Sequence, residues 1–288
     1  MNLDGRRQSS NVEDRRGTRI SGKAAGGLGL GGIIIVGIIT LLLGGNPADV
    51  IQTISGLGPG IEYSSDRTPT AEEEELAVFS SQILAGTEDV WTSIFRQYGR
   101  TYEPPKLVLY TDYVQTASGT ASAASGPFYN SADQTVYIDL SFFTSMKKEI
   151  GADGDFAYAY VIAHEVGHHV QYLLGTLGEA HSQMSRMSEK QSNQMSVRLE
   201  LQADFYAGVW AYNDNRMFGS LEKGDIEEGM AVASKIGDDY LQNKAYGRTV
   251  PDSFNHGTSE QRSRWLRKGL TTGDISQGDT FSPAYSSL

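Results

Sequence analysis

Three of the five histidines of the chain fall within six positions of an otherwise apolar stretch, "VIAHEVGHHVQYLLG", residues 161–175. An imidazole buried in a helix must find hydrogen-bond partners or a ligand, because its desolvation is otherwise uncompensated. Any fold of this chain must therefore bring such partners to the stretch. Two interpretations follow: core histidines that are hydrogen-bonded to backbone, or a metal site.

The spacing of the histidines favours the metal site. On a helix, His164 and His168 are four residues apart and share one face, and Glu165 is a neighbour on the same turn. This is the HExxH arrangement, in which two imidazoles converge on one ion and the glutamate reaches a water molecule beside it. The chain contains no cysteine, so nitrogen and oxygen atoms must supply every ligand.

A second segment, "RLELQADFYAG", supplies two carboxylates at matching spacing. A catalytic zinc takes three protein ligands and keeps one open position, so we predict Glu200 as the third ligand, after His164 and His168. Asp204 lies one turn after Glu200 and can accept the free N–H of a ligand histidine. Gly167 is tolerable in the first helix where the second helix approaches closely.

The two remaining histidines near this pattern receive other roles. His169 points about 100° away from His168 around the helix, and we interpret it as structural. His181 lies in a polar connection, which is more typical of a surface residue than of a ligand.

Length and charge limit the class of protein. The 288 residues can bury one main globular core, and the formal net charge of −11 excludes a broad nucleic-acid-binding surface, which needs clustered Lys and Arg. We therefore expect no nucleic-acid partner. The sequence does not specify the oligomeric state.

The N-terminal region has the pattern of a membrane anchor. No charged residue lies between Lys23 and Asp49, and a helix from Gly26 to Leu43 would rise about 27 Å, close to the hydrocarbon thickness of a bilayer. Six basic residues precede it, which predicts a cytoplasmic N-terminus and a single-pass protein of the cell membrane, with the catalytic domain periplasmic or extracellular. A cleaved signal peptide and a glycine-rich buried helix are the alternatives.

Composition and periodicity divide the chain into five parts. We predict a cytoplasmic basic tail (1–24), a transmembrane anchor (25–45), a linker (46–70), a globular domain that contains the candidate metal site (71–270) and a C-terminal tail that is looped or frayed (271–288).

The predicted domain has the α+β fold class. It is mainly helical, with a small mixed β-sheet, and follows one transmembrane helix. A helix follows Ala71, strands are predicted at "KLVLYTD" and "QTVYIDLSFF" around a small-residue loop or wide hairpin, and the pattern is mostly helical from residue 154.

The blocks "GRRQSSNVEDRRG", "GPFYNSADQTVYIDLSFF", "HEVGHHVQ", "RLELQADFYAG" and "HGTSEQRSRW" resemble a neutral zinc metallopeptidase family of bacterial membrane-anchored proteins. The resemblance covers nearly the whole chain. It implies a zincin-like domain with a gluzincin-like ligand set, His164, His168 and Glu200, and with Glu165 as the catalytic base. Relatives often have cysteines where this chain has Ser118 and Asn130, so a tether across the "GPFY" loop is missing here.

The function that we predict is a membrane-anchored, Zn²⁺-dependent endopeptidase acting on a peptide or unfolded protein substrate. Zinc would activate a water molecule, with Glu165 as general base. His256 is the candidate donor to the oxyanion, and Arg262 would orient it or a carboxylate; alternatively, both brace the last helix. An extended substrate could pair with "QTVYIDL" as an edge strand.

Two other functions are compatible with these residues. One is a zinc-stabilised, membrane-anchored scaffold without hydrolytic activity, in which four protein ligands close the site and Glu165 is dispensable. The other is a hydrolase of another amide-like bond, such as one in a cell-wall peptide.

Overall fold

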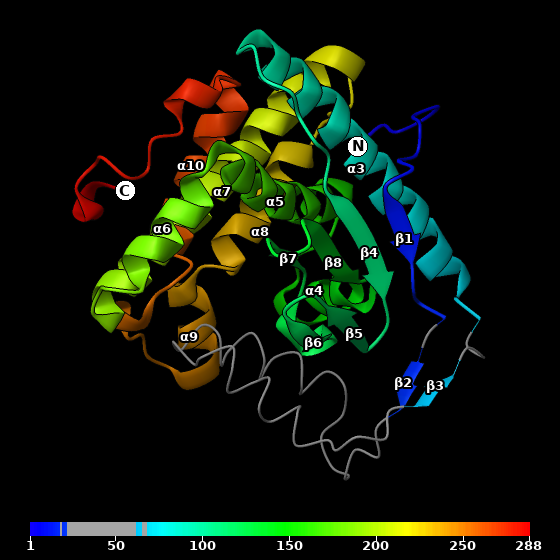
Figure 1. Cartoon of the computed structure of the whole chain (residues 1–288), viewed down its shortest axis with the longest axis horizontal. Helices are drawn as coiled ribbons and strands as arrows, with labels where there is room; N and C mark the ends of the chain where they lie inside the picture. Colours follow the sequence, from blue (N-terminus) through cyan, green and yellow to red (C-terminus); the bar gives the residue numbers. More distant parts are fainter. Residues whose placement is uncertain (18, 22–61, 65–67) are drawn as a thin grey trace.

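The computed structural model describes residues 1–17, 19–21, 62–64 and 68–288 (Figure 1). Its strands are β1 (Val12–Asp14), β2 (Arg19–Ser21), β3 (Glu62–Ser64), β4 (Lys106–Tyr110), β5 (Tyr113–Thr116), β6 (Gly119–Ser122), β7 (Phe128–Asn130) and β8 (Thr135–Asp139). Its α-helices are α3 (Ala71–Gln97), α4 (Ser141–Ile150), α5 (Asp155–Leu174), α6 (Thr176–Met184), α7 (Glu189–Phe218), α8 (Asp225–Lys235), α9 (Asp238–Tyr246) and α10 (Ser259–Thr272). The predicted α+β class, mostly helical with a small mixed sheet, is confirmed.

The main sheet has four strands in the order β1-β4-β8-β7. β1, β4 and β8 are parallel, and β7 runs antiparallel to β8. Alternation along β4 separates the two faces of the sheet, because Leu107 and Leu109 pack into the main core while Val108 and Tyr110 belong to a second cluster beside the β5–β6 hairpin. The main core lies between the sheet and the helices α3, α5 and α7.

Glycines set the closest helix contacts. A Cβ placed on Gly269 of α10 would lie 2.1 Å from the carbonyl oxygen of Phe205 in α7, and one on Gly208 would lie 2.3 Å from that of Leu266. The two backbones touch where these glycines face each other, and this contact fixes α10 on α7. α10 carries Arg262, so the glycine contact also fixes that side chain.

Most predicted elements are present, with two changes. The helix predicted after Ala71 is α3, and Thr70 begins it with a capping box to Glu73. The predicted strand "QTVYIDLSFF" ends at Asp139, and its last residues form α4. β8 is moreover an interior strand between β4 and β7, so its prediction as an edge strand is wrong.

The predicted transmembrane part of the fold, and the single-pass membrane localisation with it, are wrong. β1, from the predicted cytoplasmic tail, pairs with β4 of the domain, and β2 pairs with β3, so chain from both sides of the predicted anchor lies in one folded unit. A single crossing would place the two flanks on opposite sides of a membrane. The predicted anchor itself, 25–45, lies outside the described residues.

Within the part of the chain that the structure describes, no helix combines the length and the apolar character needed to cross a membrane.

The first residues of the chain are held by buried ion pairs. Arg6 donates from Nη2 to Oδ1 of Asp214 at 2.7 Å, and the Asp214 side chain is only 1% exposed. Arg16 pairs with Asp14 and donates to the carbonyl oxygen of Glu73. Arg6 and Arg16, two of the basic residues that suggested a cytoplasmic flank, are therefore bound within the domain, and removal of Arg6 would leave the buried charge of Asp214 without this partner.

The C-terminal residues are docked rather than frayed. Arg198 of α7 donates to the carbonyl oxygens of Phe281 and Pro283, at 3.1 and 3.0 Å, and Gln202 donates to that of Gly278 at 2.8 Å. Leu288 is buried.

Replacing Gly269 by alanine should lower the free energy of unfolding by about 1–3 kcal/mol, because the methyl group overlaps backbone atoms of α7. Thermal unfolding should show a decrease in Tm of several degrees. Gly178 of α6 is the matched control, since nothing lies within 4 Å of its Cβ position, and alanine there should stabilise by up to about 1 kcal/mol. Equal Tm values for the two variants would contradict the close contact.

Candidate metal centre

Two helices bring the three predicted ligands together. His164 and His168 lie on α5, and Glu200 lies on α7. Nε2 of His164 is 3.1 Å from Oε2 of Glu200, and Nε2 of His168 is 3.4 Å from Oε1. One ligand atom from each residue lies within 4.8 Å of the others. Ligands about 2.0–2.2 Å from a tetrahedral zinc lie about 3.3–3.6 Å apart, so the two separations between imidazole and carboxylate are close to those that this ion requires.

Asp204 orients His164. Its Oδ1 accepts from Nδ1 of His164 at 2.8 Å, which leaves Nε2 facing Glu200. Arg262 donates to both oxygens of the same carboxylate at 2.8 Å, and the hydroxyl of Tyr160 donates at 2.5 Å. Burial raises the pKa of Asp204, but the Arg262 charge and the hydrogen bonds outweigh burial, so the pKa is lowered. Asp204 thus stays ionised although it is fully buried.

Gln171 has the same role for His168. Its Oε1 accepts from Nδ1 of His168 at 2.9 Å, and its amide donates to the Leu199 carbonyl oxygen at 2.7 Å. The amide also donates to Gln202, which is bound to the C-terminal residues. Each ligand histidine therefore directs Nε2 toward the cluster and uses Nδ1 to fix its ring.

Gly167 allows the two helices to meet. A Cβ on this residue would lie 3.0 Å from the carbonyl oxygen of Ala203 and 3.1 Å from its Cα. A side chain here would push α7 away from α5 and move Glu200 from the histidines. The predicted close approach is observed.

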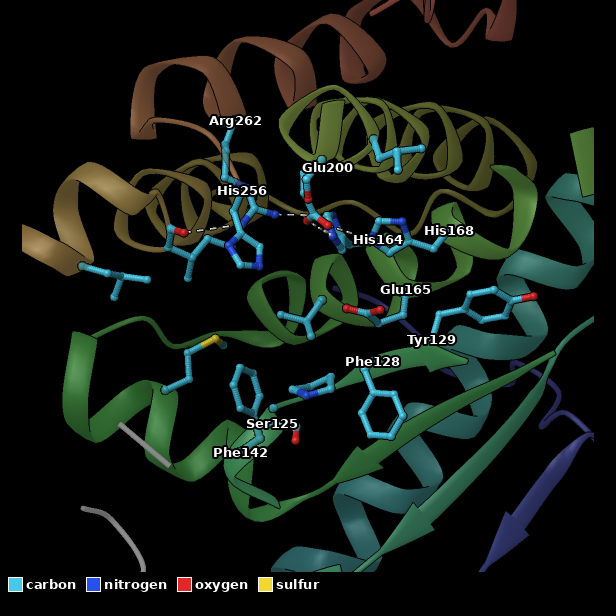
Figure 2. Close-up of a pocket in the computed structure, with 18 of the residues that line it drawn as sticks. Ser125, Phe128, Tyr129, Phe142, His164, Glu165, His168, Glu200, His256 and Arg262 are labelled. Carbon is cyan, nitrogen blue, oxygen red and sulfur yellow. Dashed lines mark hydrogen bonds and ion pairs between the residues drawn. The ribbon is translucent and has the colours of Figure 1, made fainter. Parts of the chain in front are cut away.

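The cluster forms one wall of a cavity of about 740 Å³ (Figure 2). Glu165 lies beside the cluster and lines the same cavity, although it is only 9% exposed. Burial raises the pKa of Glu165 above its usual value. A carboxylate whose pKa is moved toward neutrality, next to a metal-ligand set and an open space, has the properties of a general base.

His256 also lines the cavity, near Arg262 in Figure 2. Asp238, the first residue of α9, accepts from the backbone N–H of His256 at 2.8 Å and lies 3.3 Å from its Nδ1. Burial lowers the pKa of His256, but the hydrogen bond and charge of Asp238 outweigh burial and raise it. Arg262 was predicted to orient either His256 or a carboxylate. The structure shows the carboxylate, because Arg262 binds Asp204.

His169 is fully buried and hydrogen-bonded on both sides. Its Nε2 donates to the Glu103 carbonyl oxygen at 2.7 Å, so Nδ1 accepts from the hydroxyl of Tyr129 at 2.9 Å. Burial lowers the pKa of His169 to about 4, which keeps the ring neutral. This residue ties α5, the helix that carries His164 and His168, to β7, the edge strand of the sheet beside the cavity.

His181 is exposed at the cavity and lies outside the cluster of His164, His168 and Glu200.

A hydrogen bond occupies the place of the missing tether. Ser118, in the turn between β5 and β6, donates from Oγ to Oδ1 of Asn130 in β7 at 3.1 Å. The same amide oxygen accepts from the backbone N–H of Ala132 at 3.0 Å. The hairpin is thus fastened to the strand that borders the cavity.

Sequence reasoning missed three residues that support the site. Tyr160 lies four positions before His164, and Gln171 lies three positions after His168, so helical spacing could have indicated both. Asp238 is far from His256 in the sequence, and no local pattern joins them.

A helical pair brings two imidazoles and one carboxylate together, with a glutamate at an open cavity, and this donor set is suited to hold a metal ion. Residues 1–281 match the family described as "Putative neutral zinc metallopeptidase", and the chain belongs to this family. The uncharacterized protein YpfJ of Escherichia coli strain K12 is 47% identical over 98% of this chain and 99% of its own length. The uncharacterized protein Rv2575 of Mycobacterium tuberculosis is 36% identical over 85% of each chain. No solved structure matches the chain significantly.

Replacing Gln171 by leucine should lower zinc affinity about 10–100-fold, because His168 loses the acceptor that orients its ring. Competition with a chromophoric chelator measures the affinity, and thermal unfolding without metal checks the fold. Glu165→Gln is the control, since that residue lies outside the ligand cluster and its variant should bind zinc normally. Unchanged affinity in Gln171→Leu would show that His168 needs no such support.

Zinc uptake should release about one to two protons per ion near neutral pH. Burial lowers the pKa of His164, but Asp204 and Glu200 outweigh burial and raise it to about 10, so the metal-free ring is protonated while a ligand must be neutral. The pKa of His168 is also raised. Apparent affinity should therefore increase with pH up to about 10. Calorimetry in buffers of different ionisation enthalpy measures the release, and Asp204→Asn should reduce it.

Proposed function

We propose that this protein is a zinc-dependent endopeptidase whose metal is held by His164, His168 and Glu200. The observation that carries the proposal is the placement of these three residues and Glu165 on the wall of one cavity large enough for a peptide. Zinc bound there supplies a Lewis acid that polarises the scissile carbonyl and acidifies water. Three protein ligands leave a position for substrate or water, as in catalytic sites.

The other steps belong to residues of the chain. Glu165 takes the proton of the attacking water and passes it to the leaving amine. His256, held by Asp238, which raises the pKa of the ring, donates a hydrogen bond to the oxyanion. Among the described residues β7 is an edge strand of the main sheet, so β7 rather than the interior strand β8 can pair with an extended substrate backbone.

The scaffold alternative requires a closed site with four protein ligands. Among the described residues, the only such group of histidine and acidic side chains contains three. The cavity beside it favours catalysis, as does the name of the family.

Glu165→Gln should retain zinc at wild-type stoichiometry and reduce peptide hydrolysis at least about a hundredfold, because proton transfer contributes about 10²–10⁴. Metal analysis, Tm and cleavage of an unfolded protein substrate measure these properties together. A structural zinc predicts the opposite result: no chelator-sensitive cleavage by the wild type and full function of the variant in cells.

His256→Ala should reduce turnover about 10²–10³-fold with little loss of zinc. Asp238→Asn removes the charge that raises the pKa of His256. As the pH rises, activity that needs the protonated ring should therefore decline at a lower pH in this variant than in the wild type. The pH profile of kcat measures this shift. A folding defect without a separate catalytic defect would assign His256 to bracing the last helix.

A further inference from the structure

The cavity extends from the metal centre into a space between α4 and α9, which we call the apolar chamber. Apolar side chains from three helices and one connecting residue line it: Phe142, Met146 and Ile150 of α4, Val161 of α5, Ile236 before α9, and Leu241 of α9. Phe142, Ile236 and Leu241 remain partly exposed there, so their apolar surface has no complete covering within the described residues.

The chamber lies directly beside the reacting groups. Val161 precedes Glu165 by one helical turn, so the two side chains share a face of α5. Figure 2 shows Phe142 across the cavity from His256, on one side of Glu165, and shows Tyr129 of β7 on the other side, with Phe128 below Glu165. A peptide lying along β7 with its scissile carbonyl at the metal would place a neighbouring side chain at the chamber entrance.

The side chains that define the chamber are uncharged, and the buried cation beside it, Arg262, which donates to the Ile236 carbonyl oxygen at 3.4 Å, is already paired with Asp204. The ionisable residues that α4 and α9 add to the lining are Glu149, Lys244 and Tyr246. Lys244 is exposed and donates to the Glu149 carbonyl oxygen at the C-terminus of α4. A carboxylate or ammonium entering among the apolar side chains would lose water without gaining an ion pair.

We propose that the apolar chamber binds one large aliphatic or aromatic side chain of the substrate, adjacent to the scissile bond. The substrate class is then peptides and unfolded segments that carry Leu, Met or Phe at this position. The assignment rests on the proposed peptidase function. A difference in how one substrate side chain contacts a hydrophobic pocket discriminates between substrates by about 10–200-fold.

The test is cleavage-site mapping with the zinc-loaded protein. A mixed peptide library is digested, and the cut positions are read by mass spectrometry. One position next to the cut should be enriched at least about tenfold in Leu, Met and Phe over Asp and Lys. Leu241→Lys should abolish this enrichment and admit acidic residues, because it places an ammonium in the chamber. Met217→Lys on α7 is the matched control, because Met217 is exposed and is not among the residues that line the cavity, and this variant should keep the preference.

Two failures are distinguishable. Absence of chelator-sensitive cleavage overturns the peptidase function, whereas chelator-sensitive cleavage without an apolar preference, or with the preference intact in Leu241→Lys, overturns only the chamber.

A binding measurement does not depend on turnover. Zinc-loaded Glu165→Gln protein is titrated with two dipeptide hydroxamates that differ in one side chain, isobutyl or carboxymethyl. The isobutyl compound should bind at least about tenfold tighter, and Leu241→Lys should remove the difference. Equal affinities in the parent protein overturn the chamber.

Discussion

The site depends on one buried carboxylate. Asp204 is fully buried, and a charge in that position is tolerable only with close partners. Arg262 from α10 and His164 and Tyr160 from α5 supply them, so Asp204 on α7 joins three helices at one point. The hydrogen bonds that compensate the charge of Asp204 include the one that orients His164, a proposed metal ligand. Assembly of the core therefore also assembles the cluster.

The local part of the site could be predicted from sequence because residues four positions apart in a helix lie on the same face. The four-residue intervals at His164 and His168 and at Glu200 and Asp204 placed each pair on one face, and Gly167 indicated the close approach. The α+β class followed from the same periodicity. Contacts between distant segments could not be predicted, such as Asp238 with His256, because nothing local encodes which loop returns to which helix.

The errors arose where a segment was interpreted without its partners. The N-terminal arginines resembled a cytoplasmic flank, but Arg6 pairs with Asp214, more than 200 positions later. β8 resembled an edge strand because its neighbour β7 has only three residues, within a loop rich in small side chains. The C-terminal residues lack periodicity, and they are bound to Arg198 through carbonyl oxygens and through the hydroxyl of Thr280, which donates to the Arg198 carbonyl oxygen.

The bond between Ser118 and Asn130 has a consequence for redox behaviour. A hydrogen bond, unlike a disulfide, is neither formed by oxidants nor opened by thiols. The chain has no cysteine, so mixed disulfides with glutathione and sulfenic acids cannot form anywhere in it. The strand that borders the cavity is consequently fastened equally well in reducing and oxidising surroundings, whereas a cysteine pair at these positions would make that fastening conditional on the redox state of the compartment.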